Sequence, residues 1–438
     1  HVQSKSRTDN RPGCKSMDDP MLTPGIIPNK EPMIRVGLIL PEDDIKSIHI
    51  SFSDSQCFEI EIGNRLHPSC KNNNQINLNL VNGDLVIPEL EFENSSLKII
   101  PSIPHENPFV TLNGVPAGRG FHWEKKINSS YWGALEFKVK NGKMICVNEL
   151  PLEYYLKCVA TSEMSAQCPP EFLKVQTIVA RSWLLANIEQ KHRHLGFDIC
   201  NDDCCQRYQG MANCTEASIK SANDTFGQAI MFENKICDAR YSKSCGGITE
   251  DYNHVWEGDP VPYLISIKDV NESNTDFCSP EIVPEETLKN YIGDVDEKGK
   301  YFRWTYNATQ GELIQSLKEK RNVIAGKILN LYPVKSGESG RIIDLTFDYE
   351  DENGQSQSIQ IQSEYEIRNI MSPSFLFSSA FTIQKNDKGN FILHGKGWGH
   401  GVGLCQIGAL GMAISGKSSE EILDHYYPDT KLKKIYSL

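Results

Sequence analysis

Residues 148–187 constrain the fold more than any other stretch, because they predict two amphipathic helices joined by a polar corner. In the first segment, apolar residues recur at i, i+4 and i+7 from Leu152, which marks one buried helical face. Pro169 and Pro170 open the second segment, where apolar residues from Phe172 onward repeat at intervals of three and four. Two buried helices in direct succession indicate a packed globular unit.

Glu163 lies in the corner between the two predicted helices. It follows Leu152 by eleven residues, almost three helical turns, so a continuous helix would place it on the apolar face. A carboxyl group there either caps a helix or pairs with Lys174 or Arg181. Alternatively, it is held partly away from water, stays protonated and acts as a general acid. The local sequence leaves both interpretations open.

Charge and hydropathy narrow the range of partners. The 438-residue chain has a formal net charge of -12 and contains no clustered basic stripe, which argues against binding to nucleic acid or to an anionic membrane surface. No run of 18 apolar residues occurs, so we expect no membrane span. Because the chain begins at His1, we expect that a signal segment or anchor has been removed from it.

The order of segments predicts an α+β fold in three parts. Residues 1–30 are polar and lack periodicity, as expected of a flexible tether. Residues 31–110 contain short β-branched segments between turn residues and predict a small β-rich accessory region. Residues 111–438 form the main domain, which an α/β insertion interrupts at about residues 270–340.

Glycine occupies every second position from residue 395 to residue 403. An extended run of this kind has one face of bare backbone, against which an extended ligand could lie. His400 within the run is either a structural histidine with satisfied hydrogen bonds or a catalytic residue. A phosphate loop is excluded, because no Gly-Lys-Ser/Thr follows the glycines at the required spacing.

Fourteen cysteines are many for a protein of the reducing cytoplasm, and Cys200, Cys204 and Cys205 crowd into one loop. Together with His194 they could supply the nitrogen and sulfur ligands of a tetrahedral zinc ion. In an oxidising compartment, Cys200 could instead form a disulfide with another cysteine. The spacing leaves a metal site, disulfides and free thiols open.

Three blocks of the sequence together resemble the SpoIID/LytB family, which comprises the stage II sporulation protein D group and the amidase enhancers. The blocks are NELPLEYYLKCVATSEMSAQCPPEFLKVQTIVARSWLLA, RYSKSCGGITEDYNHVWEGDPVPYL and GKGWGHGVGLCQIGALGMAISGKSSEEILDHYYPDT. Their order and spacing match the family pattern from roughly residue 110 to residue 438, with an insertion between the second and third blocks. The resemblance therefore implies a SpoIID-like catalytic domain.

This resemblance implies a secreted or periplasmic lytic transglycosylase that cuts the glycan strands of peptidoglycan. Glu163, in the Ser-Glu-Met step of the first block, matches the essential glutamate of the family. A glycosidase needs two carboxyl groups, whereas a lytic transglycosylase uses the C6 hydroxyl of its own substrate as nucleophile, so one acid can serve both steps. The alternative is a non-catalytic cell-wall-binding protein that enhances an amidase.

The resemblance also implies a sugar groove and a metal site. Aromatic faces stack on pyranose rings, and glycines let a strand approach closely. The expected groove residues are Tyr241, Ser244, Cys245, Gly246, Gly247, Trp398, Gly399, His400 and Gln406. Arg181 would orient Glu163, contact an anionic group of the substrate or form an ion pair with an acid; for Tyr241 and Trp256 the alternative is core packing. Some family members carry zinc near the cysteine loop, and the proposed chemistry itself requires no cofactor.

Overall fold

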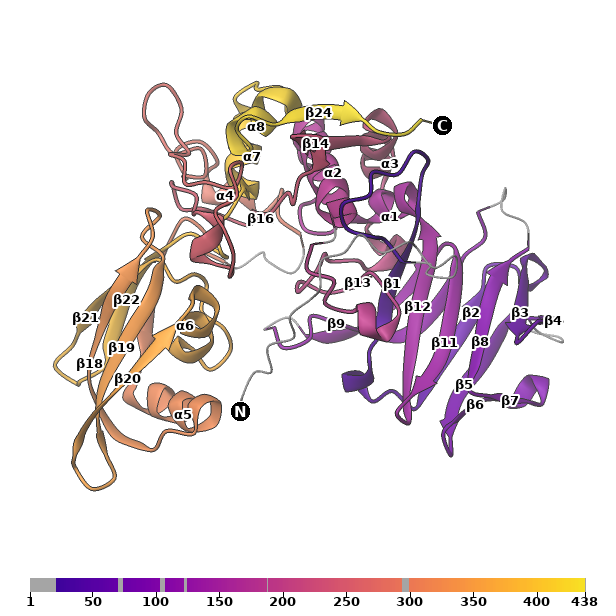
Figure 1. Ribbon diagram of the computed structural model, residues 1–438, viewed down its shortest axis with the longest axis horizontal. Helices are drawn as coiled ribbons and strands as arrows, with labels where there is room; N and C mark the ends of the chain where they lie inside the picture. Colours follow the sequence, from indigo (N-terminus) through magenta and orange to yellow (C-terminus); the bar gives the residue numbers. More distant parts are fainter. Residues whose placement is uncertain are drawn as a thin grey trace.

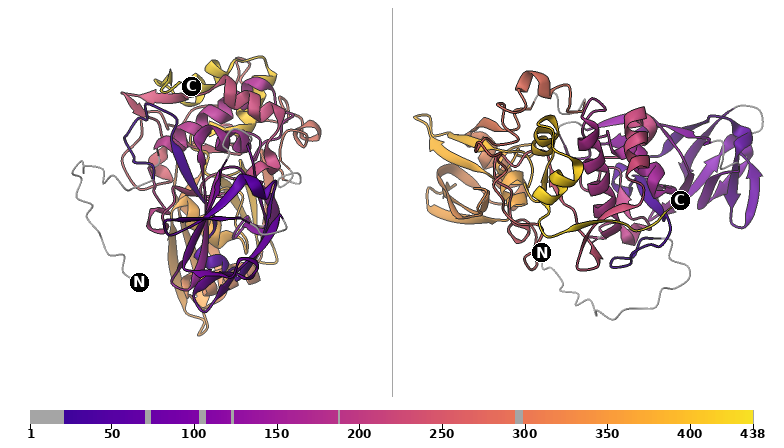
Figure 2. Two further views of the ribbon diagram at one scale, coloured as in Figure 1. Left: turned by 90° about the vertical axis from the view of Figure 1, so that its right-hand side faces the viewer. Right: turned by 90° about the horizontal axis from the view of Figure 1, so that it is seen from above.

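The computed structural model describes residues 21–69, 74–102, 107–121, 124–186, 188–293 and 299–437. Residues 1–20 of the predicted tether lie outside this range. Figures 1 and 2 show an elongated molecule with the β-sheets of residues 33–151 at one end, here called the N-terminal end, a helical centre and an α/β lobe at the other end. In the described residues, no helix is long and apolar enough to cross a membrane.

Two sheets form the N-terminal end, one of seven strands in the order β13-β1-β12-β11-β8-β3-β4 and one of six in the order β10-β9-β2-β5-β6-β7. Alternate residues of β2 are buried, as its β-branched pattern predicts. The strands are β1 (Met33–Ile39), β2 (Ser47–Phe52), β3 (Phe58–Ile62), β4 (Arg65–Pro68), β5 (Gln75–Val81), β6 (Asp84–Ile87), β7 (Phe92–Asn94), β8 (Ser96–Pro101), β9 (Val110–Ala117), β10 (Lys125–Tyr131), β11 (Ala134–Lys140), β12 (Lys143–Pro151) and β13 (Ile199–Cys200).

The expected boundary at residue 110 does not separate two units. β1 pairs antiparallel with β12, so that Met33 lies opposite Pro151, and β8 pairs with β11. Residues 31–110 therefore share their sheets and one hydrophobic core with residues 110–151 and with α1. Hydrogen bonds between strands distant in sequence decide this arrangement, and sequence pattern does not encode them.

The central part contains the two predicted helices, α1 (Leu152–Val159) and α2 (Pro170–Ala186). Glu163 lies in the turn between them and not on α1, so the helix does not continue as far as this residue. The reason is local, because both the N–H and the hydroxyl of Ser162 donate to the Val159 carbonyl and end the helix there. The polar corner itself is confirmed.

A second hydrophobic core lies beneath this corner. It unites α2 with elements from the middle and the end of the chain. These elements are α3 (Glu216–Asp224), β14 (Gln228–Phe232), β16 (Tyr241–Ser242), α4 (Glu285–Leu288), β23 (Leu404–Cys405), α7 (Gln406–Ile414) and α8 (Ser419–Tyr426). Two short strands, β15 (Lys235–Ile236) and β24 (Lys431–Lys434), pair with β14 on either side. The C-terminal helices α7 and α8 of the third block thus pack directly onto α2 of the first block, as Figure 1 shows.

The insertion forms a lobe that spans residues 303–396, later in the chain than the expected 270–340. β17 pairs with β22, so that Arg303 lies opposite Lys396 and closes the lobe, which encloses a core of its own. Its elements are β17 (Arg303–Ala308), α5 (Gln310–Arg321), β18 (Ala325–Ser336), β19 (Ile342–Asp351), β20 (Ser356–Gln362), α6 (Glu364–Met371), β21 (Phe381–Lys385) and β22 (Phe391–Lys396). The lobe is the orange unit in Figure 1.

The glycine run is not an extended strand with a bare face, which corrects that prediction. β22 ends at Lys396, and the four glycines from Gly397 to Gly403 have φ angles of 72°, 90°, 77° and 73°. Only glycine adopts this left-handed conformation without strain. A Cβ atom at Gly401 would lie 2.3 Å from the guanidinium carbon of Arg341, so close packing, and not ligand access alone, requires glycine.

Candidate active site

Glu163 is held by two neutral hydrogen-bond donors. The hydroxyl of Tyr241 donates to Oε1 at 3.0 Å, and Nε2 of Gln406 donates to Oε2 at 2.9 Å. The side chain of Lys243 donates to the backbone carbonyl of Glu163 at 2.9 Å. Both carboxyl oxygens are therefore oriented while the group stays half-buried and borders open space.

Segments far apart in the chain bring these partners together. Tyr241 lies in β16, and Gln406 is the first residue of α7. β16 pairs in parallel with β23, where Tyr241 lies opposite Leu404, which places the two donors side by side. Gln406 also donates to Gln176 of α2 at 3.0 Å. The three sequence blocks thus converge on one carboxyl group.

Burial raises the pKa of Tyr241 well above its usual value, and the negative charge of Glu163 adds to this rise. The phenol therefore keeps its proton at neutral pH and remains a donor. Tyr241 lines the cleft as expected, so its ring does not serve core packing alone.

A cleft of about 530 Å³ opens beside Glu163, large enough for a small ligand or part of a chain. Its walls come from the N-terminal end, the central part and the insertion lobe. Five of the predicted groove residues line it together with Glu163: Tyr241, Trp398, Gly399, His400 and Gln406.

An aromatic wall runs along one side of this cleft. Trp398 stacks on Phe377 of the insertion lobe, with ring centroids 4.4 Å apart and planes at 16°. Trp256 packs against His400 at 4.9 Å and lies under the guanidinium of Arg240 at 4.3 Å. Flat aromatic faces at the edge of a cleft are suited to stacking on sugar rings. The lobe residues were not predicted, because their contact with Trp398 depends on packing between distant segments.

His400 is a neutral residue of this wall. Burial, and then the positive charges of Arg240 and Arg341, lower the pKa of His400 well below its usual value. Part of the ring still faces the cleft, where water screens the charges of the arginines, so burial remains the larger cause. Its Nδ1 accepts the Val402 N–H at 3.0 Å, which leaves the ring proton on Nε2. These contacts favour the structural interpretation of His400 over a catalytic one.

Six cationic side chains line the cleft although the chain is acidic: Arg119, Lys191, Arg207, Arg240, Lys243 and Arg368. Sequence reasoning missed this group. Arg240 and Lys243 flank Tyr241 in the second block, and this proximity to a predicted groove residue was the available signal.

The carboxylates of the cleft differ in their partners. Glu189 forms ion pairs with Arg240 at 3.0 Å and with Lys191 at 2.7 Å, and Asp203 pairs with Arg207 at 3.0 Å. Among the described residues that line the cleft, Glu163 is the carboxyl group held by neutral donors instead of by a cation. It is therefore the carboxyl group best able to exchange a proton with a ligand.

Arg181 does not line the cleft, and its predicted contact with the substrate or with Glu163 is wrong. Its side chain is fully buried and donates to both oxygens of Glu153, at 2.9 and 2.7 Å. The ion pair links α2 to the first turn of α1, so the expectation of an ion pair with an acid is the one confirmed. Spacing alone could not distinguish Glu153 from Glu163 as the partner.

Four residues of the second block also lie behind the cleft and not in its wall: Ser244, Cys245, Gly246 and Gly247. Ser244 and Cys245 are fully buried. A Cβ atom at Gly246 would lie 2.7 Å from the backbone nitrogen of Gly397, so this glycine permits close packing against the glycine run. The predicted substrate contacts of these four residues are wrong, because the chain turns inward after Lys243.

The cysteine loop forms a compact group of possible ligands, here called the outer cysteine cluster: His192, Cys200, Cys204 and Cys205. All four ligand atoms lie within 4.8 Å of one another. The Cys204 sulfur is 3.0 Å from that of Cys200, 4.0 Å from that of Cys205 and 3.8 Å from Nε2 of His192. Hydrogen bonds from Cys200 and Cys205 lower the pKa of Cys204 far below the usual value of a thiol.

His194 is not part of this cluster, which corrects the predicted ligand set. Its backbone carbonyl accepts a hydrogen bond from the side chain of Lys140, and it lies in a short 3-10 turn that ends at Leu195. The nitrogen atom that lies within the cluster belongs to His192, two residues earlier. The sequence His-Arg-His offers both histidines, and the turn decides between them.

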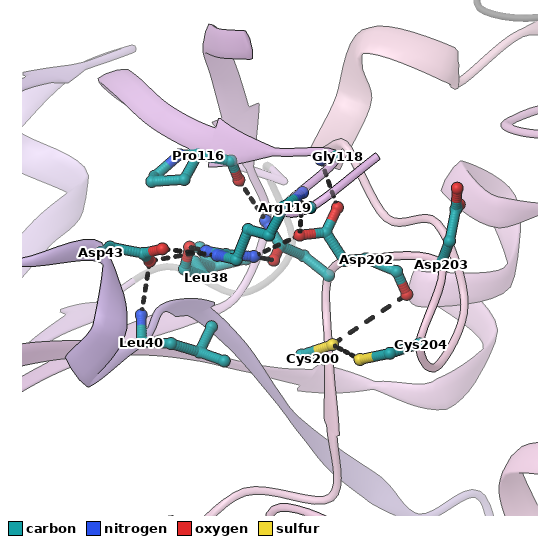
Figure 3. Close-up of polar contacts among 12 residues, drawn as sticks. Leu38, Leu40, Asp43, Pro116, Gly118, Arg119, Cys200, Asp202, Asp203 and Cys204 are labelled. Atoms are coloured by element: carbon teal, nitrogen blue, oxygen red, sulfur yellow. Dashed lines mark hydrogen bonds and ion pairs between the residues drawn. The ribbon is translucent and has the colours of Figure 1, made fainter. Parts of the chain in front are cut away.

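A network around Arg119 fastens the loop that carries the outer cysteine cluster (Figure 3). Arg119 lies between two acids and donates to Asp43 and to Asp202, each at 2.6 Å. The backbone N–H of Gly118 donates to Asp202 as well. Because Cys200 and Cys204 flank Asp202, this network fixes the sulfur atoms relative to the N-terminal sheets and to the cleft.

Comparison with known proteins relates these segments to a family. Residues 140–232 match the model of the Stage II sporulation protein family (SpoIID), and residues 250–403 match a domain of unknown function (DUF8618). An uncharacterized protein of Brachyspira hyodysenteriae is 31% identical over 301 residues, which cover 68% of this chain and 70% of that protein. The amidase enhancer of Bacillus subtilis is 27% identical over 300 residues, covering 63% and 40% of the two chains. The stage II sporulation protein D of Bacillus amyloliquefaciens is 26% identical over 306 residues, covering 66% and 76%.

Proposed function

Because the chain belongs to the SpoIID family of stage II sporulation proteins, we propose that it is a lytic transglycosylase of the cell wall. It would cleave the MurNAc–GlcNAc bonds of peptidoglycan glycan strands and leave 1,6-anhydroMurNAc ends. A role in the cell wall agrees with the relatives named for sporulation and for amidase enhancement. The proposal includes a secreted or periplasmic location, where the substrate lies.

Glu163 is the acid and then the base of this reaction. Its protonated carboxyl group donates the proton to the glycosidic oxygen as the bond from that oxygen to the anomeric carbon of MurNAc breaks. The C6 hydroxyl of the same sugar attacks that carbon and closes the anhydro ring. The Glu163 carboxylate then accepts the hydroxyl proton, which restores the starting state. No water is consumed, and no cofactor takes part.

The single observation that carries this proposal is the difference between the partners of the three carboxyl groups that line the cleft. Glu189 and Asp203 are engaged by cations, whereas Glu163 is held by Tyr241 and Gln406. A hydrolase would need a second carboxylate, either as nucleophile or to activate water. A cleft with one such carboxyl group supports a reaction whose nucleophile belongs to the substrate.

The walls of the cleft suit an anionic glycan. Trp398 and Trp256 offer flat faces to the sugar rings. The lactyl group of MurNAc carries a carboxylate when the stem peptide is absent, and stem peptides carry carboxylates of their own. The guanidinium groups of Arg207 and Arg240 are suited to such carboxylates, because each presents several donors in a plane.

The outer cysteine cluster is proposed to hold a structural zinc ion. Tetrahedral zinc with sulfur ligands at roughly 2.3 Å requires sulfur atoms about 3.8 Å apart, close to the 4.0 Å between Cys204 and Cys205. The 3.0 Å between Cys200 and Cys204 is shorter than this zinc geometry requires and longer than the roughly 2.05 Å of a disulfide bond. A zinc ion would fasten the loop at the edge of the cleft and supply no chemistry to the reaction.

The substitution Glu163→Gln keeps the shape of the side chain and removes its proton. We expect it to lower the release of anhydro ends by roughly 100- to 10,000-fold, the usual contribution of a general acid and base. Purified glycan strands, with and without stem peptides, are digested and the ends are identified by mass spectrometry. Asp203→Asn is the matched control; it removes another cleft carboxylate and should leave activity of the same order as that of the wild type.

Release of anhydro ends by Glu163→Gln at the wild-type rate would show that the assignment is wrong. Release of reducing ends by the wild type, with uptake of water, would instead identify a hydrolase. Circular dichroism of both variants excludes loss of folding as the cause of any change.

The alternative function is that of a cell-wall-binding protein that enhances an amidase. The similarity to the Bacillus subtilis amidase enhancer supports it, although the aligned region covers 40% of that protein. The same variant separates the two functions. An enhancer would stimulate a cell-wall amidase equally well with Glu163→Gln, and the wild type would release no anhydro ends.

A further inference from the structure

Directly behind the wall of the cleft lies a second group of metal-ligating side chains, here called the inner cysteine cluster: Cys245, Asp269, Cys278 and Cys405. Cys245, Asp269 and Cys405 are fully buried, and Cys278 is 3% exposed. Their ligand atoms all lie within 4.8 Å of one another. These residues come from four separate segments, so the cluster is a product of the fold and not of one local motif.

The separations in this cluster fit one tetrahedral ion. Ligand atoms around zinc should lie about 3.8 Å apart for two sulfurs at roughly 2.3 Å and about 3.5 Å apart for a sulfur and an oxygen. The Cys245 sulfur is 3.9 Å from that of Cys278 and 3.3 Å from Oδ2 of Asp269. Three sulfur ligands and one oxygen in this geometry favour zinc over magnesium or calcium, which prefer oxygen ligands.

The surroundings orient Asp269 as a ligand. Its Oδ1 accepts hydrogen bonds from His425 at 2.9 Å and from the hydroxyl of Tyr426 at 2.8 Å, both on α8. The other oxygen, Oδ2, lies on the side of the sulfur atoms, where a metal ion would bind. Carboxylates that bind metals are commonly held in this way through their second oxygen. A fully buried carboxylate next to three thiols would otherwise carry a large desolvation cost.

Backbone N–H groups point at the sulfur atoms as well. Cys405 accepts from the N–H of Cys245 and from that of Gly408, both at 3.2 Å, and Cys245 accepts from the N–H of Gly247 at 3.3 Å. Such donors stabilise thiolates more than neutral thiols. The role of Gly247 is therefore to donate its backbone N–H to the Cys245 sulfur, and not to contact the substrate.

We propose that the inner cysteine cluster binds a single zinc ion, independently of the outer cysteine cluster. The ion would fasten the second block to the third. Cys405 is the N-cap of α7, and the next residue, Gln406, donates to Glu163. The zinc ion would thus fix the start of α7 and the amide that orients the proposed catalytic carboxyl group. Its role is structural, because the ion has no access to the cleft.

A disulfide is the competing arrangement for these thiols. Three sulfur atoms cannot all be paired within the cluster, and a disulfide would provide no positive charge to balance the Asp269 carboxylate. An iron–sulfur cluster fits less well, since its ligands must surround several iron atoms and lie farther apart than those of one ion. The separations therefore favour a mononuclear site.

The test begins with a variant that lacks the outer cysteine cluster, Cys200→Ser/Cys204→Ser/Cys205→Ser, purified without chelators. We expect elemental analysis to find one zinc ion per chain in this variant. Adding Cys278→Ser should abolish that ion, whereas adding Cys168→Ser, a buried cysteine outside both clusters, should retain it. Replacement of zinc by cobalt should give the visible spectrum of tetrahedral cobalt with thiolate ligands.

The cobalt spectrum keeps the test decisive if the Cys278→Ser variant fails to fold, because it is recorded on the parent variant. Peptide mass mapping under non-reducing conditions tests for the competing disulfide. No stoichiometric zinc in the folded parent variant, or a disulfide that joins two of Cys245, Cys278 and Cys405, would overturn the proposal. An octahedral cobalt spectrum without thiolate bands would overturn it as well.

Discussion

The buried ion pair between Arg181 and Glu153 provides a direct test of structural against substrate-binding roles. Arg181 donates to Glu153 through two nitrogens, at 2.9 and 2.7 Å, and both side chains are closed to solvent. The hydroxyl of Tyr436 also donates to Glu153, at 2.6 Å. Arg181→Met keeps most of the volume of the side chain but leaves a buried carboxylate without its cation.

The expected cost follows from this environment. Breaking a buried ion pair by removal of one partner destabilises proteins by about 3–5 kcal/mol, since the remaining charge stays buried. Tyr436→Phe removes one hydrogen bond to the same carboxylate and should cost less, about 1.5–3 kcal/mol. The double variant Arg181→Met/Glu153→Leu removes both charges and should regain most of the loss.

Urea unfolding, followed by circular dichroism and by tryptophan fluorescence, measures these differences. Both probes are needed, because a chain with several cores can unfold in steps and a single free energy then loses its meaning. The affinity for glycan strands is measured in parallel below the unfolding transition. A loss of stability under about 1 kcal/mol for Arg181→Met, or weaker glycan binding at unchanged stability, would refute the structural role.

Four further predictions follow from the site. Tyr241→Phe removes a donor to Glu163 and should lower the turnover of glycan strands about tenfold with little change in KM, which steady-state kinetics can measure. Trp398→Ala should instead raise KM by roughly 3- to 10-fold, as expected for the loss of one aromatic stack. In protein purified without chelators, Cys204→Ser should lower the zinc content by one ion per chain; unchanged metal content would argue against zinc at that site. Because the pKa of His400 is lowered on folding, the unfolded chain binds the proton first as the pH falls. Stability should therefore decrease below about pH 6.5 by up to about 1.4 kcal/mol per pH unit, and His400→Gln should remove that slope in urea unfolding at several pH values.

The sequence predicted the helices of the central part better than the residues at which they end. The apolar spacing located α2, and the third block located the start of α7 near Gln406. The position of Glu163 in a polar corner was also correct. The sequence left the end of α1 open, because it depends on a hydrogen bond from Ser162 that competes with the helix. Local side-chain contacts of this kind shift helix ends by a few residues without leaving a periodic signal.

Residues far apart in sequence account for most of the site that was missed. Phe377 reaches the cleft only because the insertion lobe folds against the third block. The sequence shows the lobe and the block, but it does not show that they are in contact. The exchange of His192 for His194 has a different cause, since His192 precedes the short 3-10 turn and His194 lies within it. The net negative charge of the chain gave no sign of the cationic side chains that line the cleft.

The glycine run shows why the insertion lobe forms part of the cleft. Arg341 of the lobe is fully buried and donates to the carbonyl groups of Gly399, Cys245 and Ser244, at 3.1, 3.3 and 3.4 Å. It thereby joins the second block to the third beneath the aromatic wall. A side chain at Gly401 would occupy the position of this guanidinium, so the glycine at that site is required by the lobe. The cleft beside Glu163 therefore depends on one arginine from a segment that none of the three blocks contains.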